Sequence, residues 1–131
     1  MKTQATAEPR ISDQKSKQII RGQEVSTLQF HGLAIKDYTA GADTSSSFAV
    51  VQVPPGEKHR RAFSKRSDKY YYVVTGSVVF TLGDQEQTLS TGDFCLIRKG
   101  EQYSYQNNSN DTAVLCHVHT PSFDLDSEVF L

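Results

Sequence analysis

Short runs of β-forming residues, each ended by a turn signal, follow one another along the chain from Leu28 onward. The runs are rich in Val, Phe, Tyr, Thr and Leu, and Gly, Pro, Asn or Asp separates them roughly every 8 to 15 residues. The pattern predicts strands over residues 28–38, 47–53, 69–75, 77–82, 86–89, 94–97, 103–107 and 112–119. So many short strands exceed what an open sheet in a small chain can hold, since exposed edges must be closed or covered. We therefore predict an all-β jelly-roll β-barrel with little helix.

The chain has 131 residues, which suits one domain. Residues 1–22 are polar and contain Pro9, so they are predicted to be an arm that is flexible or crosses to a partner. Residues 23–131 form the predicted barrel domain. Its last stretch, 121–131, alternates Phe and Leu with acids, which fits either an edge strand or a partly ordered terminus.

The charge is balanced overall but uneven along the chain. Lys and Arg number 14 against 15 Asp and Glu, so there is no global field to attract nucleic acid or an acidic membrane. Six of the basic residues lie within 58–69. We interpret this window as a solvated loop at the barrel mouth or as an anion clamp built on Arg60, Arg61 and Arg66. No apolar run reaches the ~20 residues that span a bilayer, and no secretory signal is recognisable, so a cytoplasmic protein is expected. Cys95 and Cys116 lie in apolar runs and are predicted to be buried thiols.

A spacing pattern in the second half of the chain carries a family resemblance. Gly92, Gly100 and Asn107 stand at the spacing of the second conserved motif of the cupin superfamily, although Arg98 and Tyr103 replace its proline and histidine. Upstream, the segments Pro54-Pro55-Gly56, His59 and Tyr70 to Gly76 look like the first cupin motif. The resemblance covers about residues 48–121 and implies the same barrel fold as the strand pattern.

Catalytic cupins hold a divalent metal with two His and a Glu from the first motif and a His from the second. At the matching positions this chain has Lys69 for the glutamate and Tyr103 for the second-motif histidine, and at most His59 survives. The motifs are therefore degenerate, and we expect a metal-free pocket without a cofactor. One alternative is a metal held by His59, His117 and His119, because the last two share one strand face. The other, which we favour, places His117 and His119 on the outer face or at the strand end.

The resemblance and strand alternation predict which side chains point into the barrel. Lys69 and Tyr71 should face Tyr103, Tyr105 and Asn107 there. We name His59, Tyr71, Tyr103 and Lys69 as candidate acid–base residues, with Lys69 expected to lower the pKa of a neighbouring phenol. The candidate ligand-binding residues are Arg60, Arg61, Tyr105 and Asn107.

Three functions stay open at this stage. The first is a protein that binds a small polar or anionic organic molecule in the barrel. The second is a metal-independent acid–base isomerase, epimerase or lyase acting on a sugar-like or carboxylate substrate, by analogy of fold with small cupins that act on nucleotide-sugars. The third is a metalloenzyme with nonstandard histidine ligands. In each case the family resemblance implies a homodimer that pairs through sheet edges, and no nucleic-acid or membrane partner is expected.

Overall fold

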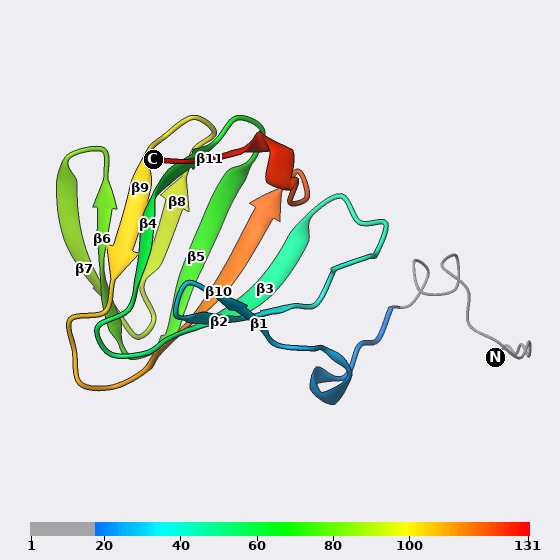
Figure 1. Ribbon diagram of the computed structural model, residues 1–131, viewed down its shortest axis with the longest axis horizontal. Coiled ribbons are helices and arrows are strands. Elements are labelled where there is room, and N and C mark those ends of the chain that lie inside the picture. Colours follow the sequence, from blue (N-terminus) through cyan, green and yellow to red (C-terminus); the bar gives the residue numbers. More distant parts are fainter. Residues whose placement is uncertain (1–17) are drawn as a thin grey trace, which may run out of the picture.

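The computed structural model describes residues 18–131 as two antiparallel β-sheets that face each other across a shared core (Figure 1). The larger sheet has the order β1 (Leu28–Phe30), β2 (Leu33–Asp37), β3 (Ser47–Val53), β10 (Ala113–Thr120), β5 (Asp68–Thr75) and β8 (Phe94–Ile97). The smaller has the order β11 (Glu128–Phe130), β4 (Lys58–Ser64), β9 (Tyr103–Gln106), β6 (Ser77–Leu82) and β7 (Gln85–Ser90). Two short 3₁₀ turns, Gly22–Glu24 and Leu125–Ser127, complete the assigned elements. The predicted all-β jelly roll is confirmed.

Two strand predictions need correction. The run 28–38 is not one strand, because a tight turn at His31 and Gly32, both at positive φ, folds it into the hairpin of β1 and β2. The basic window is not a loop at the mouth: residues 58–64 form β4, in which Ala62 and Ser64 are buried. Its charged residues masked the strand because the basic side chains of a β-strand can point away from the core. Most of the predicted arm, residues 1–17, lies outside the described residues.

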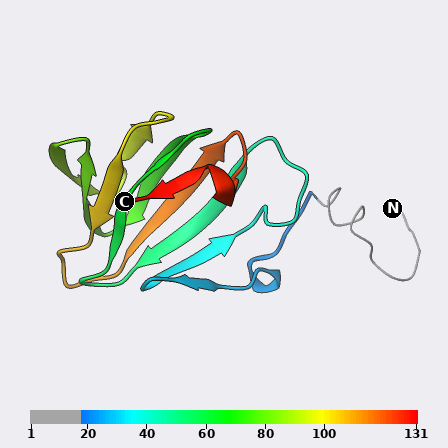
Figure 2. The same ribbon diagram turned by 45° about the horizontal axis from the view of Figure 1, so that its top comes forward.

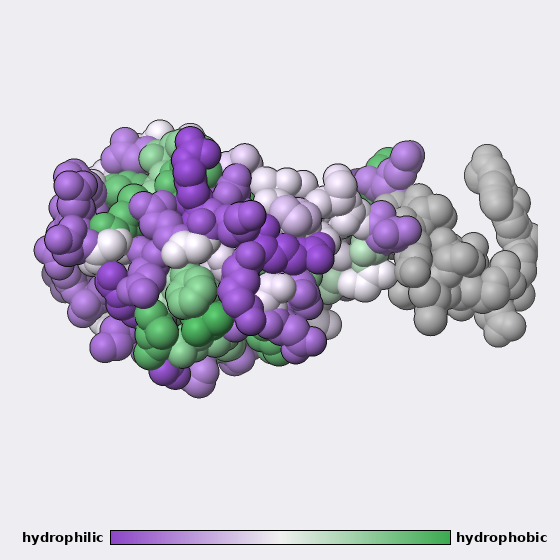
Figure 3. Space-filling view, turned by 90° about the horizontal axis from the view of Figure 1, so that it is seen from above, coloured by the Kyte–Doolittle hydropathy of each residue, from purple (hydrophilic) through white to green (hydrophobic). Residues whose placement is uncertain are grey.

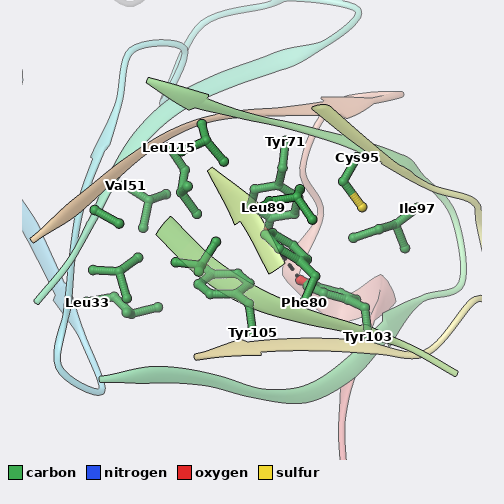
Figure 4. Close-up of a cluster of buried hydrophobic side chains, with 14 of the residues drawn as sticks. Leu33, Val51, Tyr71, Phe80, Leu89, Cys95, Ile97, Tyr103, Tyr105 and Leu115 are labelled. Carbon is green, nitrogen blue, oxygen red and sulfur yellow. Dashed lines mark hydrogen bonds between the residues drawn. The ribbon is translucent and has the colours of Figure 1, made fainter. Parts of the chain in front are cut away.

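Strand alternation builds the core between the sheets. Figure 4 shows Phe80, Tyr103 and Tyr105 of the smaller sheet facing Val51, Tyr71 and Leu115 of the larger one. These side chains are 0–2% exposed. At one end Gly76 connects β5 to β6 at φ +87°, and a Cβ there would lie 2.8 Å from the Cα of Ala113. The turn lies too close to the start of β10 to accommodate a side chain at position 76.

The outer face of the larger sheet is apolar across four neighbouring strands. Strand register places Phe48, Val118, Tyr70 and Leu96 in one row and Val50, Cys116, Tyr72 and Phe94 in the next. Phe94 is 60% exposed and Tyr72 46% exposed. Cys95 is buried as predicted, whereas Cys116 is half-buried on this outer face, because the strand it lies on turns that position away from the core. Among residues 18–131, no helix has the length and apolar character needed to cross a membrane.

Candidate functional site

A cavity of about 280 Å³ lies where the β1 side of the larger sheet meets the β11 side of the smaller one. In Figure 2 the red segment that ends in β11 passes in front of β10. The apolar wall is formed by Leu28, Phe30, Ile35, Phe123, Leu125 and Phe130. Three imidazoles also line the cavity, those of His59, His117 and His119, with the carboxylates of Asp37 and Glu128. The site is thus mostly apolar, with a few polar groups that converge on it.

His117 and His119 face the inside of the barrel. His117 pairs across the sheet with Tyr71, which is 1% exposed, and its ring stacks on the Tyr71 ring with centroids 4.1 Å apart. The ring of His119 lies 4.3 Å from that of His117. The favoured prediction of an outer-face position was wrong, because β10 is the central strand of the sheet and its outward positions are taken by Cys116 and Val118.

Burial keeps these imidazoles neutral. Loss of solvent lowers the pKa of His59 to about 4 and that of His119 to about 3. It also lowers the pKa of His117 well below its usual range, and the neighbouring His119 adds to the effect. Within residues 18–131, the Nε2 atoms of His117 and His119 are buried and have no hydrogen-bond partner. A neutral imidazole nitrogen of this kind can accept a hydrogen bond or a proton.

Lys69 connects the cavity wall to the tyrosine core. Its Nζ atom donates to Glu128 Oε1 at 2.5 Å and to the Tyr103 hydroxyl at 2.9 Å. The Tyr103 hydroxyl lies 3.4 Å from the Tyr71 hydroxyl, the contact dashed in Figure 4, and 3.4 Å from His59 Nε2. Burial lowers the pKa of Lys69, and the hydrogen bond to Glu128 opposes that effect. The result is one connected polar network inside an otherwise apolar barrel.

The predicted activation of a phenol by Lys69 is not found. Burial raises the pKa of Tyr103 and Tyr71 above the ordinary value, because a phenolate would be poorly solvated there. Tyr105 is shifted in the same direction by the same cause. The phenols are therefore neutral hydrogen-bonding groups, and the ammonium of Lys69 is balanced by the Glu128 carboxylate.

Arg60 and Arg61 do not reach this cavity. A β-bulge separates His59 from Ala62 in the pairing of β4 with β9, and the two arginines occupy it. Arg60 donates from Nε and Nη2 to the Leu131 carbonyl, at 3.2 and 2.6 Å. Arg61 donates to Gln102 Oε1 and to the Gly83 carbonyl, at 2.7 and 2.6 Å. Both line a separate depression of about 290 Å³ on the smaller sheet, so the predicted anion clamp does not form over the imidazoles.

Asn107 closes a loop instead of facing a ligand. Its Nδ2 atom donates to the carbonyls of Val53 and Asp111, each at 2.8 Å. Its Oδ1 atom accepts from the amide and the hydroxyl of Ser109, at 2.8 and 2.7 Å. The amide is fully used within the protein, which corrects the prediction that Asn107 binds ligand. Tyr105 packs in the core, 5.2 Å from the ring of His59.

The sequence interpretation missed Glu128 and the apolar wall. Alternation in residues 121–131 was compatible with an edge strand or with a partly ordered terminus, and in the structure β11 pairs with β4 as the edge of the smaller sheet. The same alternation puts Glu128 and Phe130 on one face and Val129 on the other. What it could not show was that this face would meet Lys69 from a strand 59 residues earlier.

The divalent metal that the family resemblance implies does not fit these residues. Lys69 brings a buried ammonium to the position of the family's glutamate, and Tyr103 brings a neutral phenol to that of its histidine. Across residues 18–131, no group of three or more His, Cys, Asp or Glu side chains is arranged to hold a metal ion. We derive no step through a metal.

Sequence comparison gives a family match and two relatives. The model described as "Cupin domain" matches residues 49–119. The tetracenomycin polyketide synthase protein TcmJ of Streptomyces glaucescens is 27% identical over 67 residues, which are 51% of this chain and 45% of that protein. Protein SchB of Streptomyces halstedii is 34% identical over 77 residues, 59% of this chain and 55% of that one. The chain thus spans about half the length of these curated relatives.

Structure comparison extends the likeness to most of the chain. A Streptomyces structure of the nucleoside dehydratase Pac13 superposes with a TM-score of 0.78 at 22% identity, covering 88% of this chain and 92% of that one. A PAC13 variant solved with uridine has the same TM-score. A predicted oxalate decarboxylase from Thermotoga maritima gives 0.72 at 18% identity, with 79% and 99% covered. At such identities these structures establish the shared fold.

Proposed function

Because the chain belongs to the cupin domain family, we propose that the cavity lined by His59, His117 and His119 binds a small organic molecule, and that the protein transfers a proton on it without a metal. One observation carries the proposal. Two buried, neutral imidazole nitrogens without partners adjoin an apolar cavity large enough for a ligand. Buried polar atoms are almost always satisfied in folded proteins, so an unsatisfied pair beside a cavity favours an external partner.

The site residues fit general acid–base chemistry. A neutral imidazole is the form that can remove a proton from a carbon next to a carbonyl group. The Tyr103 hydroxyl lies behind the cavity wall, 2.9 Å from Lys69 Nζ and 3.4 Å from His59 Nε2, so it can position the His59 imidazole. In this proposal one of the three imidazoles takes the proton, and the protonated imidazole returns it to the product or to a leaving hydroxyl. Isomerisation and elimination of water both follow this scheme.

Similar proteins give independent support for a small-molecule substrate. Pac13 is described as a nucleoside dehydratase and was solved with uridine. TcmJ is a polyketide synthase protein. Uridine is a ring system with polar substituents, which agrees with a cavity that combines aromatic walls and imidazoles.

Binding without turnover is the second candidate. Asp37, Glu128 and the imidazoles could orient a ligand that the protein only stores or delivers. Solvent deuterium separates the two functions, because a proton-transfer enzyme exchanges a ligand C–H proton with solvent and a binding protein does not.

The experiment is a histidine-selective NMR titration with uridine and with 2,7-dihydroxynaphthalene in deuterated buffer. We expect either probe to shift the ring signals of His117 and His119 while that of exposed His31 stays in place. The variants His117→Gln and His119→Gln should weaken binding at least tenfold, whereas the control His31→Asn should not. If neither probe moves these signals, the cavity is not a binding site. Stoichiometric transition metal that resists chelator would instead restore the metalloenzyme hypothesis.

We also propose that the molecule is a homodimer that pairs through the outer face of the larger sheet. The two rows of that face, from Phe48 to Leu96 and from Val50 to Phe94, contain no charged residue. A two-fold contact places the same patch on both partners, so an uncharged patch meets its copy without repulsion. Exposed aromatic residues in such a patch favour association over solvation.

A cytoplasmic location is likewise a proposal. Cys95 and Cys116 are both free thiols and do not pair with each other. Unpaired cysteines accord with a reducing compartment. Expression of a tagged copy in the native cell, followed by fractionation, tests this location.

A further inference from the structure

We infer that the cavity selects an uncharged molecule of about two rings that carries hydroxyl or N–H donors, and that it discriminates against anions. This inference rests on the proposed function, because it names the class of molecule that the same cavity takes. It also replaces the polar or anionic ligand that the basic residues of the sequence suggested.

The charges around the cavity argue against an anion. Among the described residues that line it there is no Lys or Arg, whereas Asp37 and Glu128 are carboxylates. The nearest ammonium, that of Lys69, is already paired with Glu128, and both side chains are 3% exposed. Arg60 and Arg61 donate to backbone and amide oxygens elsewhere. An incoming carboxylate or phosphate would meet the Asp37 carboxylate, a Glu128 carboxylate that is already paired with Lys69, and no free cation.

The unsatisfied atoms specify what the ligand must offer. Besides the Nε2 atoms of His117 and His119, Glu128 Oε2 is buried without a hydrogen-bond partner in the described part of the chain. A carboxylate oxygen only accepts, so its partner must be a donor. A hydroxyl group can donate to Glu128 and can also donate to, or accept from, an imidazole nitrogen. A molecule with two such groups would satisfy the cavity wall at two points.

The apolar wall specifies the rest of the ligand. Phe30, Phe123 and Phe130 present aromatic faces, and Leu28, Ile35 and Leu125 extend the surface. An apolar cavity of roughly 150 Å³ holds one benzene ring. The 280 Å³ here therefore suits about two rings. Flat rings contact aromatic side chains well, and burial of their surface drives binding.

Figure 3 shows the outside of this region. Seen from above, hydrophobic side chains gather over the end of the molecule where β4 and β11 lie in Figure 1, and hydrophilic ones surround them. Glu128 becomes a specificity-determining residue, because its unsatisfied Oε2 atom is the acceptor that a ligand hydroxyl requires.

The test compares three probes of the same ring size on the full-length protein near pH 7. These are 2,7-dihydroxynaphthalene, which is neutral and has two donors, 2-naphthoate, which is an anion, and naphthalene, which has no polar group. Calorimetry gives the affinities, and the His117 and His119 ring signals locate the site. We expect the dihydroxy compound to bind at least tenfold more tightly than either of the others.

Two variants assign the discrimination to the carboxylates. Glu128→Gln keeps the shape and removes the charge, so the preference for the dihydroxy compound over naphthoate should shrink at least threefold. Asp37→Asn should also reduce the preference for the dihydroxy compound over naphthoate. It serves as a second test if Glu128→Gln unfolds because Lys69 has lost its partner. The matched control is Glu86→Gln, on exposed β7 outside the cavity, and it should leave the preference unchanged.

The possible failures are distinguishable. If naphthoate shifts the His117 and His119 signals and binds as tightly as the dihydroxy compound, the cavity is a site and the inferred selectivity is wrong. If naphthalene binds equally well, the unsatisfied atoms do not recognise hydroxyl groups, which also overturns the inference. If none of the probes shifts those signals, the proposed function fails, and the inference fails with it.

Discussion

A histidine that loses its solvent on burial also loses its charge, and His59 and His119 are examples. Each is held neutral by loss of solvent, and the nearby ammonium of Lys69 adds to the effect. In the unfolded chain the same side chains have pKa values near 6.5. At pH values between the folded-state and unfolded-state pKa, the unfolded chain binds protons that the folded protein does not bind. The free energy of unfolding therefore depends on pH.

We predict that the free energy of unfolding decreases as pH falls from about 6.5 toward 4. Above pH 6.5 both states are neutral at these positions, and their contribution is constant. The loss should be on the order of a few kcal/mol, since one unit of pKa shift corresponds to about 1.4 kcal/mol. Urea unfolding at a series of pH values measures it.

Two variants separate the contribution of the buried imidazoles to this pH dependence from that of the acidic residues, which titrate at lower pH. His119→Gln should make the acid-side loss smaller, because one suppressed protonation is removed. His31→Asn, at an exposed turn position where Asn tolerates positive φ, should leave the loss nearly unchanged, because His31 is the smallest of the influences on the pKa of His59. An identical pH dependence in His119→Gln and the unmodified protein would mean that His119 is not held neutral.

At the residue level the sequence predicted part of the site. Strand alternation and the family resemblance placed Lys69, Tyr71 and Tyr103 inside the barrel, where their polar atoms contact one another. They could not predict pKa directions, because burial outweighs the local charge of Lys69 at Tyr103. They also could not predict the partner of Lys69, since that contact depends on how β11 folds back onto the barrel.

Elements are positioned by a few side chains that close the loops between them. Asn107, at the end of β9, ties the segment before β4 to the turn before β10 through four hydrogen bonds. The family spacing marked this residue, and the structure explains the spacing by loop closure. Element boundaries were otherwise well predicted where apolar alternation is strong, and poorly predicted in β4, where Lys and Arg interrupt it.

We predict that Asn107→Ala lowers the free energy of unfolding by about 2–4 kcal/mol, because several buried backbone groups lose partners together. The neighbouring Asn108→Ala is the control, since Asn108 is exposed and should change stability by less than about 0.5 kcal/mol. Urea denaturation of both variants measures the difference. Equal stabilities for the two would show that the loop holds its shape without the Asn107 amide.

The whole molecule has two faces of different character. One end holds the cavity, and the outer face of the larger sheet carries the uncharged rows that include Tyr72 and Phe94. From the family resemblance the sequence predicted a homodimer that pairs through sheet edges. It did not indicate the outer sheet face, because the outward direction of Cys116 and Val118 became known only with the pairing of β10 to β3 and β5.

We predict that the protein is a dimer in solution and that Tyr72→Glu converts it to a monomer. A carboxylate in each partner's patch would be buried against its copy, which is strongly unfavourable. Light scattering measures the mass. The control Gln52→Glu, on the same sheet but outside the two apolar rows, should remain dimeric. A monomer mass for the unmodified protein would exclude this interface.

The origin of the cavity wall bears on how relatives of this protein diverge. The family match covers residues 49–119, yet most of the wall, including Phe30, Phe123, Glu128 and Phe130, comes from segments before and after it. The barrel can therefore stay nearly constant in evolution while the flanking segments change what it accepts. Two chains that match the family model equally well can then recognise unrelated molecules. Substrates within this family are therefore better assigned from the segments that flank the matched residues than from the conserved motifs.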